Sequence, residues 1–135
     1  MNAEKETFKK SERLCSRKTI TSLFNNGNVF YPDLFKVVWS LSPATVSSPA
    51  QVVFSVSKKS YRLAVTRNLL KRRMREAYRR NKQMLYDFLR QKNIQISFIV
   101  IYKEDFVADS RDIEISMKKM IDRFIVLIKE KSEKY

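Results

Sequence analysis

Histidine is absent from this chain of 135 residues, and glycine and cysteine occur only once each. Without histidine, the sequence lacks the usual general acid or base at neutral pH and the commonest metal ligand. Because Cys15 is the only cysteine, an internal disulfide is excluded, and we expect a reducing, cytoplasmic location. These absences argue against a self-contained hydrolase.

Long apolar runs are missing as well. Runs such as FIVI at residues 98–101 are far shorter than the roughly 18 residues that indicate a membrane span. The N-terminal stretch MNAEKETFKKSER is polar throughout and does not resemble a signal peptide. We therefore expect no membrane-spanning segment, and a single domain over residues 1–135 with residues 1–12 as a flexible tail.

Acidic residues are few relative to basic ones. Lys and Arg number 28 against 14 Asp and Glu, which gives a formal charge of +14. A field of this size attracts polyanions and speeds their association. Nucleic acid is the first candidate partner, and an anionic membrane surface is the second.

The apolar pattern predicts alternating helices and strands. A short helix is expected over residues 17–27 with Gly27 as a left-handed C-cap, a long helix over about 65–91, and a last helix capped by Asp109 or Ser110. Segments rich in β-branched and aromatic residues predict strands at 34–41, 51–57 and 94–102, with a shorter one near 29–31. The first two long strands are expected to pair antiparallel across a loop at 42–50 that contains proline and serine.

These elements favour an α/β (α+β) two-layer sandwich. We expect three helices on one face of a mixed, mainly antiparallel sheet of about four strands. The strand at 94–102 is apolar on both faces over its second half, which is typical of a central strand. Part of the other sheet face, or a groove beside the first helix, would stay open.

The long helix is expected to have two different sides. Its apolar stripe consists of Leu70, Met74, Ala77, Met84, Leu85 and Phe88. A separate arc holds Asn68, Lys71, Arg72, Arg75, Arg79 and Lys82. Residues 58–82 contain eleven basic side chains and one acid, Glu76, so like charges repel without compensation. We interpret the arc as a phosphate-binding face; the alternative is a solubilising charge run.

This run resembles the signature of the bacterial ribonuclease P protein component. The matching residues are Lys58, Lys59, Ala64, Val65, Arg67, Asn68, Lys71, Arg72, Arg75, Glu76 and Arg79. The similarity continues in Arg13–Leu14, in the pattern of Phe24, Gly27 and Phe30, and in FKVVW, VVFSVSKK and IQISFIVIY. It covers about residues 13–128.

The resemblance implies the protein subunit of a ribonucleoprotein endonuclease that removes the 5′ leader of precursor tRNA. The catalytic centre and most of the Mg²⁺ would belong to the RNA subunit. The partners would be that catalytic RNA and precursor tRNA, with no membrane and no small-molecule cofactor. It also implies a left-handed βαβ crossover, where the general rule predicts a right-handed one.

The resemblance assigns site residues by position. The RNA-binding set would be Lys58, Lys59, Arg62, Arg67, Asn68, Lys71, Arg72, Arg75 and Arg79, with Asn68 also a possible metal contact. A cleft for the single-stranded leader would contain Ile20, Phe24, Phe35, Lys36 and Val38. Three features depart from the family pattern: Leu69 stands where an arginine is common, Ile20 stands where some relatives have an aromatic residue, and a glycine common after the paired lysines is replaced within SYRL.

Other interpretations stay open from the sequence. A non-catalytic RNA-binding protein of ribosomal type would use the same basic helix without a leader groove. A protein that cleaves nucleic acid unaided would need converging carboxylates. The densest acids, Asp105, Asp109, Asp112 and Glu114, lie at a predicted helix start, where capping explains them better than a metal site.

Overall fold

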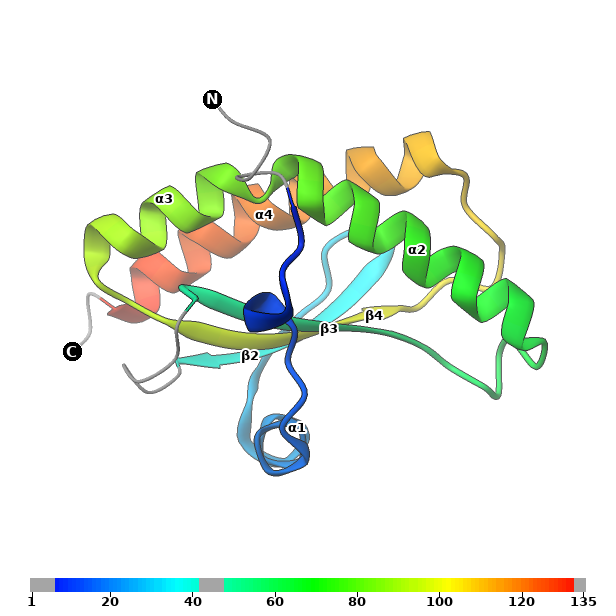
Figure 1. Ribbon diagram of the computed structural model, residues 1–135, viewed down its shortest axis with the longest axis horizontal. Helices are drawn as coiled ribbons and strands as arrows, with labels where there is room; N and C mark the ends of the chain where they lie inside the picture. Colours follow the sequence, from blue (N-terminus) through cyan, green and yellow to red (C-terminus); the bar gives the residue numbers. More distant parts are fainter. Residues whose placement is uncertain (1–6, 42–47, 133–135) are drawn as a thin grey trace.

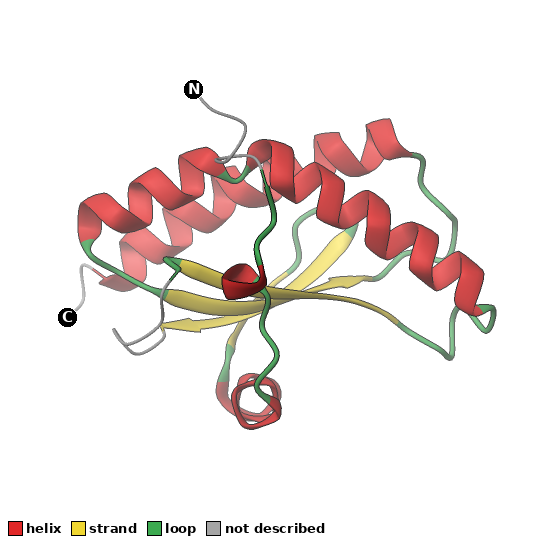
Figure 2. Ribbon diagram, viewed as in Figure 1, coloured by secondary structure: helices red, strands yellow, loops and turns green. Residues whose placement is uncertain are grey.

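The computed structural model describes residues 7–41 and 48–132, so residues 42–47 of the expected loop lie outside the described residues. The elements are η2, a 3-10 turn (Lys10–Glu12), α1 (Arg17–Asn26), β1 (Asn28–Phe30), β2 (Phe35–Leu41), β3 (Ala50–Val56), α2 (Ala64–Asn81), α3 (Gln83–Lys92), β4 (Ile96–Tyr102) and α4 (Ser110–Ser132). The four strands form one mixed sheet in the order β1-β2-β4-β3 (Figures 1 and 2). The predicted fold class is confirmed.

The pairing of the long strands differs from the sequence prediction. β2 and β3 do not pair, because β4 lies between them, antiparallel to β2 and parallel to β3. Six of the seven β4 side chains are buried, so this strand needs cover from both faces and from a neighbour at each edge. The strand order is therefore set by the need to cover β4, and not by the short connection from which a hairpin of β2 and β3 was predicted.

The connection from β3 to its parallel neighbour β4 passes through α2 and α3. In Figure 1, β3 lies nearer the viewer than β4 and both run from left to right, while the helices return above the sheet. This path is left-handed, as the resemblance implies, and it is an exception to the usual preference of such crossovers.

Helices cover the two sheet faces unequally. α2, α3 and α4 form a layer on one face, and α1 crosses the other face alone (Figure 1). The main core lies under the three-helix layer and includes Phe35, Trp39, Phe98 and Phe124. A smaller core lies under α1, where Leu23 meets Val38, Ile99 and Leu14. The prediction of all helices on one face was therefore wrong for α1.

The expected helix at 65–91 is two helices that meet at Lys82, so the chain has four α-helices among its described residues. The buried side continues through Tyr78, Lys82 and Leu89. Met84, which the helical wheel placed on the apolar stripe, is exposed. The break changes the phase of the second helix, and this explains the error.

Gly27 ends α1, but not in the left-handed conformation that was predicted. Its φ is −72° and its ψ is 158°, which any residue can adopt. Glycine is needed here for a different reason, since a Cβ atom would lie 2.5 Å from the Leu23 carbonyl oxygen and 2.6 Å from Val38 Cγ1. The turn is thus pressed against the helix end and the sheet, which brings α1 onto β2.

Residues 8–14, here called the strap, run along the free edge of β3 (Figure 1). The Leu14 amide donates to the Val52 carbonyl at 2.9 Å, and the Gln51 side chain donates to the Ser11 carbonyl at 3.2 Å. These bonds join Ser11 and Leu14 to β3, while residues 1–6 of the expected flexible tail at 1–12 lie outside the described residues. Within the described part of the chain, no helix has the length and apolar character to cross a bilayer.

Candidate nucleic-acid interface

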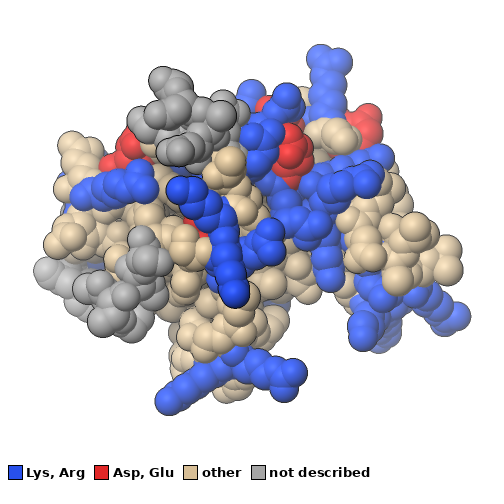
Figure 3. Space-filling view, viewed as in Figure 1, with Lys and Arg blue, Asp and Glu red and all other residues tan. Residues whose placement is uncertain are grey.

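Basic side chains gather on α2, on the loop before it and on the strap (Figure 3). We define the basic ridge as the exposed or half-exposed side chains Lys58, Lys59, Arg62, Asn68, Lys71, Arg72 and Arg75. The loop residues lie directly after β3, and the helix residues follow the helical period on the side away from Leu70 and Met74, which are fully buried. The structure thus brings together the two parts of the predicted RNA-binding set.

The cations at the centre of the basic ridge have no carboxylate partner. Among the described residues, no Asp or Glu oxygen lies within 4 Å of Lys71, Arg72 or Arg75. Arg79, one turn further along, differs because its guanidinium binds Glu76 at 2.5 Å, and this hydrogen bond lowers the pKa of the Glu76 carboxyl. The central charges are therefore available to an external anion.

Arg67, a predicted RNA-binding residue, also forms hydrogen bonds within the fold. Its guanidinium donates to the carbonyls of Tyr61 and Arg62, at 2.8 and 2.9 Å, and so fixes the loop that presents Arg62. Arg73, which the sequence analysis did not single out, donates to the Ala108 carbonyl at 2.7 Å and joins α2 to the start of α4. A helical wheel shows direction but not these carbonyl partners.

Lys82 does not belong to the outer arc where the wheel placed it. Its side chain is only 3% exposed and forms an ion pair with Glu12 of the strap, which is itself 6% exposed. The Tyr86 hydroxyl also donates to Glu12, at 2.6 Å. Burial alone would raise the pKa of Glu12, but the hydrogen bonds from Lys82 and Tyr86 outweigh it, and the pKa lies below its ordinary value. Lys82 is thus an anchor for the strap.

The five residues assigned to the leader cleft are not on one surface. Phe35 is fully buried beneath the three-helix layer, on the sheet face opposite α1. Val38 faces α1 but is only 2% exposed. Ile20 is half-buried, Lys36 is partly exposed, and Phe24 presents 58% of its surface to solvent. Neighbouring strand residues point to opposite faces, so Phe35 and Lys36 cannot share a groove.

On the sheet face that α1 crosses, one row of three side chains is partly exposed. Lys36 pairs with Ile101 across β2 and β4, and Ile101 pairs with Ser55 across β4 and β3. The neighbouring row, which contains Val38 and Ile99, is covered by α1. Sequence reasoning missed Ile101 and Ser55, because only the strand order shows that they flank Lys36.

Two of the four acids near the start of α4, Asp109 and Glu114, have structural partners. The Asp112 amide donates to the Asp109 carboxylate at 2.9 Å, so Asp109 caps the helix as predicted. Glu114 accepts a hydrogen bond from Arg80 at 3.3 Å. Over the described residues, no three Cys, Asp or Glu side chains come together as potential metal ligands.

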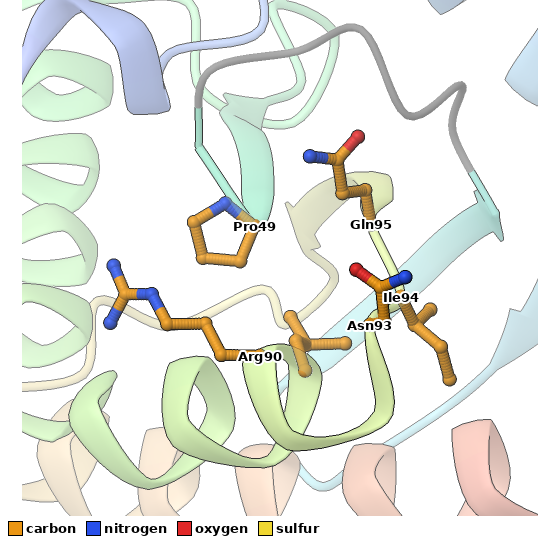
Figure 4. A pocket seen from close by; sticks show the side chains of 6 residues that line it. Pro49, Arg90, Asn93, Ile94 and Gln95 are labelled. Atoms are coloured by element: carbon orange, nitrogen blue, oxygen red, sulfur yellow. The ribbon is translucent and has the colours of Figure 1, made fainter.

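One surface hollow lies within the candidate interface and another lies outside it. One of about 390 Å³ lies on the outer side of α2 and is lined by Asn68, Arg72 and Arg75 together with apolar atoms. Another, of about 210 Å³, lies where β3 and β4 begin, between Pro49 and Arg90 (Figure 4). The second is at the opposite end of β3 from Lys58 and is separate from the basic ridge.

Sequence comparisons match the chain to one family. The family model described as Ribonuclease P matches residues 8–125. A ribonuclease P protein component from Porphyromonas gingivalis is 37% identical over 114 residues, which cover 84% of this chain and 83% of the relative. A protein of the same name from Chlorobium phaeobacteroides is 42% identical over 83 residues, which cover 59% of this chain and 57% of the relative.

Solved structures of the same name share the fold. The RNase P protein from Thermotoga maritima has a TM-score of 0.66 and 22% identity, over 83% of this chain and 96% of that protein. The Staphylococcus aureus RNase P protein has a TM-score of 0.63 and 21% identity, over 79% and 89%. With the family model matching most of its length, the chain belongs to the ribonuclease P protein family.

Proposed function

We propose that the chain is the protein subunit of ribonuclease P, which binds the catalytic RNA and the 5′ leader of precursor tRNA. Family membership supports this assignment. The observation that carries it is the basic ridge, whose central cations Lys71, Arg72 and Arg75 lack carboxylate partners among the described residues. The repulsion between these like-charged side chains is offset when RNA phosphates supply neutralising anions.

The protein's contribution is electrostatic and positional. Arginine guanidinium groups bind phosphate oxygens in pairs, and they allow negatively charged RNA segments to approach each other. The catalytic centre would belong to the RNA subunit, and Mg²⁺ held mainly by that RNA would supply Lewis-acid chemistry. The exposed amide of Asn68, beside Arg72 and Arg75, would face this region, and its oxygen can accept a hydrogen bond from a metal-bound water.

The leader would lie beside α1. Phe24 offers an exposed ring on which a base can stack, and Lys36, in the row with Ile101 and Ser55, offers a charge for the phosphate backbone. Phe35 and Val38 lie outside this contact surface and support it from within the two cores. A reducing, cytoplasmic location suits the single exposed Cys15.

Reconstitution tests the proposal. Precursor tRNA, a candidate catalytic RNA and Mg²⁺ are incubated at low ionic strength, with and without the protein. We expect 5′ leader release to become faster when the protein is present, and the protein alone to release none. Leader release by the protein without any RNA subunit, or no effect of the protein on the RNA-catalysed reaction, would contradict the proposal. An RNA-binding protein of ribosomal type would give the second result.

A further inference from the structure

A cavity of about 490 Å³ lies at the free edge of β3, between the strap and α2. This volume is within the range of about 300–1,000 Å³ that ligand sites occupy. The cavity is distinct from the open row beside α1, and none of its lining residues comes from β2 or β4. No leader-cleft residue and no part of the loop after β3 lines it.

The lining of this cavity combines positive charge with apolar carbon. Arg13 comes from the strap, while Lys71 and Arg75 come from the basic ridge. Val52 and Phe54 contribute buried surface, with 1% and 6% of each residue exposed. No carboxylate belongs to the described lining, so nothing within it neutralises the three cations.

Two planar groups of the strap also line the cavity. The Phe8 ring packs against Phe54, with ring centroids 6.1 Å apart, which holds it in place. The guanidinium of Arg13 lies over the same Phe8 ring, with its carbon 5.6 Å from the ring centroid. A planar cation held by an aromatic ring is a surface on which a nucleobase can stack. The burial of Glu12 with Lys82 fixes the strap that carries both groups.

The geometry points to a pocket for one unpaired nucleotide of the catalytic RNA. Its base would enter beside Phe8 and Arg13, and its phosphate would contact Lys71 and Arg75. We assign the nucleotide to the catalytic RNA because Lys71 and Arg75 also belong to the basic ridge, so the cavity is continuous with the surface proposed to bind that RNA. The inference rests on the proposed function and adds a site to it.

Cys15 lines the cavity and is exposed, so it provides a test by filling. Cys15→Tyr places a ring in the cavity and removes no cation. We expect this variant to bind the catalytic RNA about tenfold more weakly, through loss of base stacking. The slope of log affinity against log salt concentration should not change, because no phosphate contact is lost. The matched control is Val126→Tyr, which adds the same ring to an exposed position on α4.

A fully paired RNA of equal length shows whether Cys15→Tyr acts by filling the cavity or by disturbing the RNA-binding surface as a whole. It offers no unpaired nucleotide, so it should bind the Cys15→Tyr variant and the unchanged protein equally. Lys71→Ala, which removes a proposed phosphate contact, should weaken binding of the catalytic RNA and also reduce the salt slope by about one. Equal binding of the catalytic RNA by Cys15→Tyr and Val126→Tyr would overturn the inference.

Alkylation of Cys15 in the protein without substitutions gives a second readout, which does not depend on whether a variant folds. We expect saturating catalytic RNA to slow its reaction with N-ethylmaleimide at least about tenfold. In a Cys15→Ser, Val126→Cys protein, the same RNA should leave the reaction rate unchanged. Protection that appears only when precursor tRNA is added would overturn the assignment to the catalytic RNA. If the unchanged protein binds no catalytic RNA at all, the proposed function fails instead.

Discussion

Lys82 and Glu12 form an ion pair in which both side chains are almost completely buried. Two charges removed from water are tolerated only when each has partners, and Glu12 also accepts from the Tyr86 hydroxyl and from the Lys9 amide. The pair joins the strap to the junction of α2 and α3, at a separation of 70 residues in the sequence. One local contact therefore fixes the position of the N-terminal segment.

Lys82→Met tests this anchor. The variant leaves the Glu12 carboxylate buried without its cation, which should lower the free energy of unfolding by about 3–5 kcal/mol. Urea unfolding followed by circular dichroism measures the change. Adding Glu12→Gln to Lys82→Met should recover part of the loss, because it removes the unpaired charge and keeps the Tyr86 hydrogen bond. A loss below about 1 kcal/mol would mean that the pair is solvated.

The lowered pKa of Glu12 predicts how acid affects stability. A carboxyl group whose pKa is lower in the folded state contributes its full stabilisation at pH values above its ordinary pKa of 4.5. That stabilisation is lost as the pH falls through the lower, folded-state pKa. Glu12→Gln resembles the protonated carboxyl group, so its deficit in unfolding free energy should be present near neutral pH and disappear in acid. A deficit that does not change with pH would contradict a charge-dependent role.

Arg67 and Arg75 should respond differently to the same truncation. Arg75 has no carboxylate partner among the described residues, so Arg75→Ala should weaken RNA binding and leave the melting temperature unchanged. Arg67 donates to two backbone carbonyls, so Arg67→Ala should also lower the free energy of unfolding by about 1–3 kcal/mol. Thermal melts and RNA titrations of both variants check this. Equal melting temperatures would show that the Arg67 hydrogen bonds do not stabilise the fold.

At the scale of elements, α1 and α2 present their functional side chains in different ways. α2 exposes a continuous side because its period runs uninterrupted from Ala64 to Asn81. α1 buries Leu23 over Val38 and Ile99 and leaves Phe24, the next residue, largely exposed. The close approach at Gly27 sets how near α1 lies to the sheet. The orientation of Phe24 is therefore set by packing in which its own ring takes little part.

Phe24→Ala tests the use of α1. Because the ring is 58% exposed, its loss should change stability little, while affinity for precursor tRNA should fall by roughly the 1–3 kcal/mol typical of one stacked base. Mature tRNA lacks the leader, so its affinity for the reconstituted complex should be the same with either protein. Equal losses for precursor and mature tRNA would place Phe24 outside the leader contact.

The parts of these elements that a sequence can predict are those that depend on a local period. The outward directions of Arg72 and Arg75 followed from the helical repeat, and the Asp109 cap followed from its position before an apolar stripe. Lys82 was misplaced because its partner, Glu12, is distant in the sequence. The grouping of Phe35 with Lys36 came from resemblance, although strand alternation already separates them.

Across the whole molecule, the sheet order was the least accessible feature. The apolar residues of segment 94–102 predicted a central strand, and β4 is central, but no local pattern distinguishes a hairpin of β2 and β3 from the insertion of β4 between them. The left-handed crossover was likewise implied by resemblance alone. Long-range order of this kind depends on which arrangement covers all apolar faces together, and a pattern within one element does not contain it.

The charge of the whole molecule gives the last prediction. The chain carries +14, and the structure places the basic ridge along one side with few acids nearby (Figure 3). If RNA binding through this surface neutralises about five phosphates, log affinity should fall with log salt concentration with a slope near −4, or somewhat less steeply for single-stranded RNA. Titrations of the catalytic RNA at several KCl concentrations measure the slope. Replacing both Arg72 and Arg75 with Ala should reduce it by about two, whereas replacing Lys118 and Lys129, exposed on α4, should leave it unchanged. A slope that is near zero, or that the α4 replacements reduce equally, would show that binding depends on total charge or on uncharged contacts rather than on the basic ridge.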